Sequence, residues 1–361
     1  MKLSYFTMPL HPLGRNYTDT LREDREAIIL ADKLGFEEAF VGEHVTDLAE
    51  TITSSLLFLA TLAGDTETIK LCTGTVNLPQ NHPALIASQV AMLDHILEGR
   101  FMLGISGGAL PSDAEALGIP FADRVEMMVE SIDHILALWN EEPPYRRYGK
   151  HWTISTENTH IDDLGLGVFH KPYQLPHPPI VGTVVEPFSK GVVELAARGW
   201  FPLSGGFLLP KWVATHWPKY VEGCERVGRH ANPADWRVAK SIFVADDANV
   251  ADDYGRTSPT SPYRHYFSHF ILKAKMAGRI NLFKPDRDLP DDYVTVERAL
   301  DDLVICGDVD SVVDQILAFR EEIGDFGTLV YAGHDWVDAD LSRRSMELMA
   351  TEVMPRISDA I

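Results

Sequence analysis

The chain has 361 residues, with 53 acidic against 32 basic side chains and a formal net charge of −21. This charge disfavours binding to nucleic acid or to an anionic membrane, and an apolar content of 45% excludes a disordered acidic chain. Cys72, Cys224 and Cys306 are too few and too far apart for a disulfide framework. No apolar run suggests a signal peptide or a membrane span, so we expect a cytoplasmic protein.

Short apolar runs alternate with longer helical ones along the first half of the chain. Strands such as Phe101-Met102-Leu103 are continuously apolar, which is typical of a parallel sheet buried on both faces. Glycines follow the first three helices, where they favour helix termination. The predicted strands are residues 2–8, 38–43, 69–78 and 100–106, and the predicted helices are 19–34, 53–63, 84–97 and 124–139.

The second half continues the alternation around two insertions, at about 141–179 and 246–301. Its predicted strands are 179–183, 201–204, 237–244 and 328–332, and its helices are 189–198, 211–227, 311–322 and 339–354. Eight strand–helix units without a linker predict an α/β fold, a closed (β/α)8 TIM barrel forming one domain over 1–361. An open doubly wound sheet is the alternative fold.

In such a barrel the chemistry lies at the carboxyl ends of the strands. Glu43-His44 there pairs a carboxylate with an imidazole, a combination suited to proton transfer, although His44 could instead be structural. Gly104–Gly108 matches G-x-S-x-G, the nucleophile elbow of serine hydrolases. Because Ala109-Leu110-Pro111 follows instead of an immediate helix, a glycine-rich turn open to a ligand is favoured.

Two further patterns concern ions. Ser189-Lys190-Gly191 opens a helix, where free N–H groups and a cation could bind an anion, or where Ser189 could simply cap the helix. His265 and His269 have metal-ligand spacing, but no third ligand accompanies them, so we expect no metal. Dinucleotide and P-loop fingerprints are absent.

Segments in order along the whole chain resemble the bacterial luciferase-like flavin monooxygenase family. They include the Leu-Asp-x-x-x-x-Gly-Arg-Phe signature at 93–101, and the full set is 35–44, 74–83, 93–105, 171–180 and 306–312. Within the family, the long insertion and the ending Ala332-Gly333-His334-Asp335 are most similar to the diketocamphane and limonene monooxygenase branch.

The resemblance implies a two-component monooxygenase that acts as a homodimer. A separate NAD(P)H-dependent flavin reductase would supply reduced FMN, and O2 would add to it as a C4a-peroxyflavin. That species would oxygenate a small hydrophobic ketone, aldehyde or terpene. An F420-dependent oxidoreductase of the same fold and a non-catalytic flavin-binding protein are the alternatives.

The resemblance also implies roles for residues. His44, beside Glu43, falls on the family's active-site histidine, and Gly74-Thr75 falls where members hold a non-prolyl cis peptide under the flavin. Ser106 and Gly107 fall where luciferase has a reactive cysteine and a phosphate-binding arginine, so Lys190 or Arg198 would supply the missing charge. The predicted cofactor contacts are Gly74, Thr75, Ser106, Gly107, Gly182, Ser189, Lys190, Gly191 and Ser204.

The second insertion matches the family's variable region, and we expect its aromatic residues to close over the substrate. The predicted pocket residues are Phe6, Tyr263, Tyr266, Phe267 and Phe283. Both insertions are expected to roof the barrel mouth, because a reactive flavin intermediate must be shielded from water.

Overall fold

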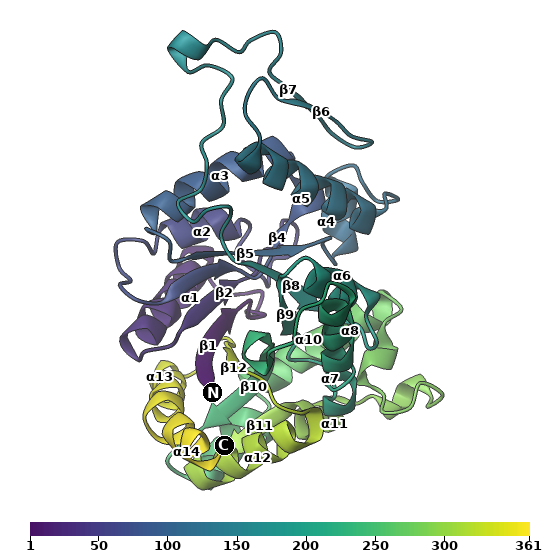
Figure 1. Cartoon of the computed structure of the whole chain (residues 1–361). Helices are drawn as coiled ribbons and strands as arrows, with labels where there is room; N and C mark the ends of the chain where they lie inside the picture. The colour runs from purple at the N-terminus through teal and green to yellow at the C-terminus, as the bar shows by residue number, and fades with distance from the viewer.

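In the computed structural model, which describes residues 1–361, eight parallel strands close into a barrel (Figure 1). The barrel closes because β10 pairs with β12 on one side and with β9 on the other. The eight strands are β1 (Lys2–Thr7), β2 (Glu38–Val41), β3 (Lys70–Thr73), β5 (Phe101–Ser106), β8 (Ile180–Val184), β9 (Phe201–Ser204), β10 (Arg237–Val244) and β12 (Thr328–Ala332). The predicted (β/α)8 architecture is confirmed, and an open sheet is excluded.

Side chains at alternate strand positions fill the interior of the barrel. They form one buried layer made of Phe40, Cys72, Met102, Val181, Leu203, Ala239 and Val330. Phe6 of β1 lies beside Phe40 in register and packs against this layer while remaining partly exposed. Because these side chains fill the barrel interior, a ligand can enter only above the layer, at the carboxyl ends of the strands.

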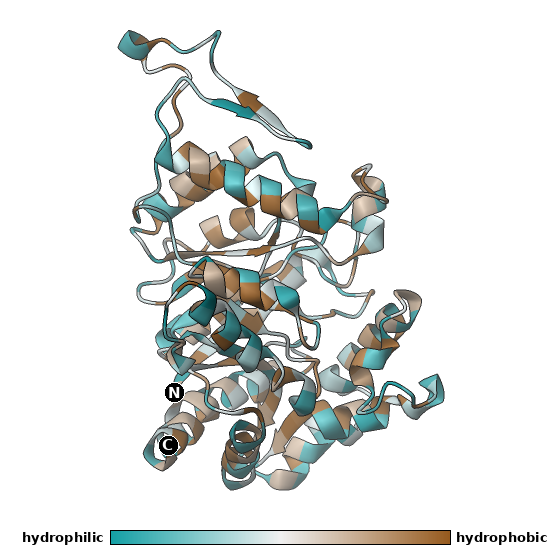
Figure 2. Ribbon diagram, turned by 45° about the vertical axis from the view of Figure 1, so that its right-hand side comes forward, coloured by the Kyte–Doolittle hydropathy of each residue, from teal (hydrophilic) through white to brown (hydrophobic).

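Helices surround the barrel, and their ribbons show apolar and polar residues on different faces (Figure 2). Asn16 caps α1 by accepting hydrogen bonds from the backbone of Thr18 and Asp19. None of the helices combines the length and apolarity that crossing a bilayer requires. They are α1 (Tyr17–Lys33), α2 (Ser55–Ala60), α3 (Pro83–Ile96), α4 (Pro111–Ala116), α5 (Arg124–Asn140), α6 (Lys190–Ala197), α7 (Pro210–Val213), α8 (His216–Arg226), α9 (Ala248–Asp252), α10 (Pro262–Met276), α11 (Val296–Leu303), α12 (Val309–Ile323), α13 (Ala339–Leu348) and α14 (Met354–Ala360).

Several elements differ from the prediction. The third strand ends at Thr73 and is followed by the short β4 (Val76–Asn77) and a 3-10 turn. The helix predicted at 211–227 is divided into α7 and α8, because Pro218 cannot donate to the carbonyl of Ala214 and its ring would clash there. The short strand β11 (Val304–Gly307), which extends the sheet beside β10, and helix α4 were not predicted.

The first insertion contains a strand pair, β6 (Arg146–Tyr148) antiparallel to β7 (Thr153–Ser155). This hairpin lies beyond α3 and α5, away from the barrel strands (Figure 1). Glu130 of α5 anchors it by accepting hydrogen bonds from the backbone of Lys150, His151 and Trp152. The prediction that this insertion roofs the mouth is therefore wrong, because its contacts are with the outer helices.

The second insertion packs over the mouth through α10. At one end of the helix, the ring of Tyr266 contacts that of His334, which follows β12. At the other end, Lys273 pairs with Asp47 and Glu50, which follow β2. Because only β1 separates β12 from β2 in the barrel, these contacts place α10 over this part of the mouth, as predicted for this insertion.

Candidate active site

His44 lies directly after β2 and is held between two carboxylates. Its Nδ1 is 2.9 Å from Asp113 Oδ2, and its Nε2 is 3.0 Å from Glu50 Oε2. The contact with Asp113 is a well-aligned hydrogen bond, whereas the contact with Glu50 is a close but poorly aligned charge pair. Asp113 is itself fixed, because its other oxygen accepts hydrogen bonds from the backbone and hydroxyl of Thr46.

These contacts determine the charge of the site. Burial alone would lower the pKa of His44, but the hydrogen bond to Asp113 and the close negative charges of Asp113 and Glu50 outweigh it and raise the pKa to about 10. The pKa of Asp113 is lowered to about 2, because hydrogen bonds from His44 and Thr46 outweigh its desolvation. His44 is thus an imidazolium at neutral pH, with Nδ1 held by Asp113 and Nε2 facing Glu50.

Glu43 has a different geometry from the one expected of a catalytic carboxylate. One oxygen accepts hydrogen bonds from the backbone and hydroxyl of Ser55, and the other accepts from the backbone of Asn77. Burial raises the pKa of Glu43, although these hydrogen bonds oppose the shift. With both oxygens occupied, Glu43 joins β2 to α2 and β4 and offers no free atom to a substrate.

The ends of β3 and β5 form a neutral polar wall. The Gly74–Thr75 peptide bond is cis, as the family resemblance implies. The Thr75 hydroxyl donates to Ser106 Oγ at 2.8 Å, and Ser106 donates to the Asn77 side chain at 2.7 Å. Ser106 therefore has no histidine partner, which excludes the serine-hydrolase arrangement at this position.

The helix N-termini beside this wall carry the candidate phosphate contacts. Ser189 makes no side-chain cap bond to α6, so its hydroxyl and the nearby N–H groups are free, while Lys190 and Gly191 are exposed. Arg198 instead pairs with Asp133 on α5 and stacks over Trp200. That pairing makes Arg198 a poor candidate for the missing phosphate cation.

Sequence reasoning missed Arg124, the first residue of α5. Its backbone packs against Gly107, where a Cβ atom would lie 3.3 Å from the Arg124 carbonyl oxygen. Its guanidinium forms no ion pair, and the buried Nη1 has no hydrogen-bond partner. An unpaired arginine beside a glycine turn is a signal that only the tertiary structure provides.

Two predicted cofactor contacts face neighbouring elements instead of an open site. A Cβ at Gly182 would lie 2.1 Å from Leu195 Cδ1, so this glycine permits β8 to pack against α6. The Ser204 hydroxyl is fully buried between His216 Nδ1 at 2.8 Å and Trp236 Nε1 at 2.9 Å. The geometry of both residues supports packing roles.

The aromatic residues of the second insertion divide into two groups. Tyr266 stacks on Phe270, which packs against Phe207 and Phe283, so these rings form a continuous wall. Phe267 is fully buried in the core, and the Tyr263 hydroxyl donates to the Ile242 carbonyl oxygen at 2.6 Å. Phe207 and Phe270 are wall residues that the sequence analysis missed.

One buried cluster combines groups that could bind a metal. His11, Glu23 and Asp335 approach one another closely. However, the Arg15 guanidinium already lies between the two carboxylates, 2.7 Å from Glu23 and 2.5 Å from Asp335. The cluster therefore contains its own cation.

Comparison with known proteins identifies the family. Residues 1–325 match the family model described as luciferase-like monooxygenase. The chain belongs to the luciferase-like monooxygenase family. It is 34% identical to 4-hydroxyprotoasukamycin monooxygenase of Streptomyces nodosus subsp. asukaensis, covering 99% of this chain and 92% of the relative. It is also 25% identical to limonene 1,2-monooxygenase of Rhodococcus erythropolis, covering 98% and 86%.

Comparison with solved structures supports the same family. The oxygenating constituent of 3,6-diketocamphane monooxygenase from Pseudomonas putida, a type II Baeyer-Villiger monooxygenase solved with FMN, matches with a TM-score of 0.89 and 26% identity over 99% of this chain and 98% of that one. An F420-dependent tetrahydromethanopterin reductase from Methanopyrus kandleri shares the fold at a TM-score of 0.69 and 20% identity, over 99% and 100% of the two chains.

The residues present fit a flavin mononucleotide. The unpartnered Nη1 of Arg124 offers a donor for a phosphate next to the Gly107 turn. The hydroxyls of Thr75 and Ser106 offer neutral polar contacts, and the partly exposed Phe6 and Tyr266 offer apolar surface for a ring. The site thus combines one cationic end with an apolar interior.

Proposed function

We propose that this protein is the oxygenase component of a two-component system. It uses reduced FMN and O2 to insert one oxygen atom into a hydrophobic ketone, aldehyde or terpene. The observation that carries the proposal is the charged His44, held by Asp113 and Glu50 at a barrel mouth that aromatic α10 covers. The similarity to an FMN-bound oxygenating constituent supports it.

Bound reduced FMN would supply the chemistry that activates O2, and the chain's residues would control its surroundings. His44 presents a protonated ring where negative charge develops on oxygen, and Asp113 fixes the orientation of that ring. The wall of Tyr266, Phe270 and Phe283 excludes water from the same space. Arg124, assisted by Lys190 and the N-terminus of α6, would hold the phosphate.

A separate NAD(P)H-dependent reductase is proposed to deliver the reduced flavin. Two relatives are named as an oxygenase component and an oxygenating constituent, which supports this division of labour. We also propose a homodimer formed through an exposed apolar patch. The patch consists of Leu85, Met92 and Ile96 on one face of α3, with Tyr173 and Leu175 from the adjoining loop.

The experiment that tests the function compares cofactors. Purified protein is supplied with either reduced FMN or reduced F420, in air and anaerobically, with a panel of cyclic ketones and terpenes. We expect O2-dependent product only with reduced FMN, because F420 transfers hydride without activating O2. Product formed with F420 and without O2 would favour the hydride-transfer alternative, and no product with either would favour a non-catalytic flavin-binding protein.

A further inference from the structure

The loop after β12 directs a histidine into the barrel mouth. Gly333 faces outward, because a Cβ there would lie 2.2 Å from the hydroxyl oxygen of Tyr5. The next residue, His334, turns inward and meets Ser241, which follows Ala239 of the interior layer by two positions on β10. His334 therefore stands above that layer, on the side where a ligand would enter.

A buried ion-pair network holds this loop rigidly. Asp335 Oδ1 is 2.5 Å from both His11 Nδ1 and Arg15 Nη1. The backbone N–H of Trp336 donates to Glu23 at 2.7 Å. Since the residues that follow His334 are fixed, its ring has a defined position, as recognition of a ligand requires.

The two ring nitrogens of His334 have different surroundings. Nε2 lies 3.0 Å from Ser241 Oγ, whereas Nδ1 has no hydrogen-bond partner. The residue is only 8% exposed, so water does not supply the missing partner freely. A buried nitrogen left unpaired keeps an uncompensated desolvation cost, so a ligand atom is a natural partner for it. The Ser241 hydroxyl has no other partner and can donate to Nε2, which leaves the proton on Nδ1.

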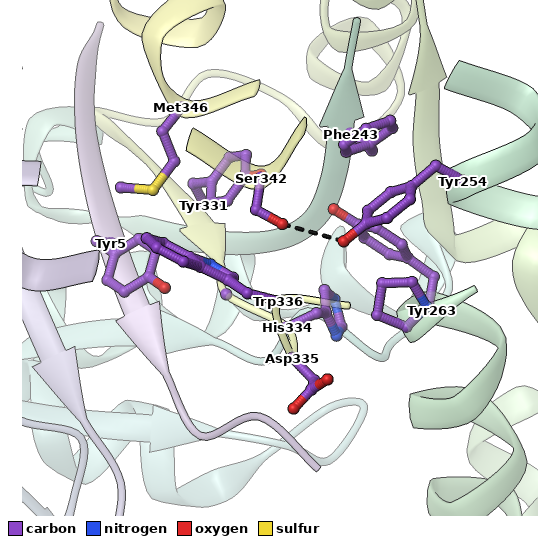
Figure 3. Close-up of a pocket in the computed structure, with 12 residues that line it drawn as sticks. Tyr5, Phe243, Tyr254, Tyr263, Tyr331, His334, Asp335, Trp336, Ser342 and Met346 are labelled. Carbon is purple, nitrogen blue, oxygen red and sulfur yellow. Dashed lines mark hydrogen bonds between the residues drawn. The ribbon is translucent and has the colours of Figure 1, made fainter. Parts of the chain in front are cut away.

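Two aromatic rings pack against the His334 ring. The ring centroid of His334 is 4.3 Å from that of Tyr263 and 4.7 Å from that of Tyr266, and Figure 3 shows His334 beside Tyr263. Burial lowers the pKa of His334 to about 3, so the ring is neutral. Apolar walls with one placed donor are typical of sites that bind small molecules with a single polar group.

We propose that His334 Nδ1–H donates a hydrogen bond to the carbonyl oxygen of the substrate, and so selects a ketone or aldehyde over a hydrocarbon of the same shape. This inference rests on the proposed function, whose substrate range includes terpenes without a carbonyl. A carboxylate is disfavoured as the ligand, because the adjoining network has three acidic groups, Glu23, Asp24 and Asp335, against the two cations His11 and Arg15.

The test compares matched ligands and matched variants. Equilibrium dialysis measures binding of cyclic ketones, each paired with its parent hydrocarbon, to FMN-loaded wild type, His334→Phe and His334→Asn. FMN affinity is measured separately for each, so failure of the cofactor assignment would be visible by itself. His230→Phe, which changes an exposed histidine that follows α8 in the chain, is the control.

We expect His334→Phe to lose about tenfold in ketone affinity, the order of one buried hydrogen bond, with hydrocarbon affinity unchanged. His334→Asn, which keeps an N–H donor, should recover part of the loss. Nitrogen-15 NMR of wild type should show the proton on Nδ1. Equal losses for both ligands in the Phe variant, no loss in either, or a wild type that prefers no ketone over its hydrocarbon would overturn the proposal.

Discussion

His44 is in an unusual electrostatic position for a residue expected to shuttle protons. A histidine in water is protonated only below about pH 6.5, but Asp113 and Glu50 keep this one charged throughout the neutral range. It would therefore act as an acid or as a fixed positive charge instead of a base. The family resemblance located His44, but the sequence did not indicate its charge.

The charge of His44 makes stability depend on pH. Its pKa in the folded state, about 10, exceeds the unfolded value near 6.5, so its stabilising contribution is complete below pH 6.5 and is lost as pH rises through 10. We predict that His44→Gln lowers the thermal midpoint most at pH 6–7 and least at pH 10. The control His230→Gln should show no such trend, and a loss that grows with pH would contradict the assignment.

A second prediction concerns Arg124 and the phosphate of FMN. Replacing it with Ala should weaken FMN binding by about tenfold, the effect of one charge-assisted hydrogen bond, while riboflavin binding is unchanged because riboflavin lacks the phosphate. Lys190→Ala should have a smaller effect in the same direction, since this side chain is exposed. Fluorescence titration with both flavins measures the affinities, and equal losses for FMN and riboflavin would exclude a phosphate contact.

Helix α10 links the aromatic wall to the charged site. Lys273 pairs with Glu50, and Glu50 also contacts His44, so one carboxylate is shared between the covering helix and the candidate acid. The side chains that cover the mouth and the side chain that holds charge there are thus connected through direct contacts. Loosening the helix should admit water at the same place where His44 acts.

We predict that Lys273→Met increases hydrogen exchange over α10 and raises the fraction of O2 released as hydrogen peroxide, by a few-fold. The matched control is Lys275→Met, which changes an exposed lysine on the same helix. Hydrogen-exchange mass spectrometry and a peroxide assay provide the two measurements. Identical behaviour of the two variants would show that the Lys273 pairing does not hold the helix over the site.

The elements that sequence reasoning predicted are those with long or strongly apolar patterns. The barrel strands and outer helices follow from periodicity, and the cis peptide at Gly74–Thr75 followed from resemblance. Helix α4 is only six residues long and was missed, and with it Asp113, the partner of His44. Glu50, Arg124 and His334 could not be assigned either, because their roles depend on atoms far apart in the chain.

For the whole molecule, the net negative charge opposes the binding of an anionic cofactor. A surface at −21 repels the FMN phosphate, so binding must depend on local cations such as Arg124. The two insertions serve different regions: the second covers the mouth, and the first extends along the outer face of α3 and α5. The loop that returns from the first insertion contributes Tyr173 and Leu175 to the apolar patch.

This patch predicts the oligomeric state. Met92→Glu, in the middle of the exposed face of α3, should convert a homodimer into a monomer, because a buried unpaired carboxylate would be costly at the interface. Sedimentation velocity measures the outcome, and Val227→Glu, at an exposed apolar position after α8, is the control. A dimer that persists in Met92→Glu, or a wild-type monomer, would contradict the proposed interface.

The role proposed for His44 is to direct oxygen from O2 into an organic product. The most direct measurement supplies reduced FMN and ¹⁸O2 with a ketone that the protein binds, and follows the label by mass spectrometry. Wild type should place one ¹⁸O atom in the product, while His44→Ala should bind FMN normally yet form at least tenfold less labelled product, the low end of the range for loss of an acid–base group. An unlabelled product, or an unchanged yield in His44→Ala, would contradict this role of His44.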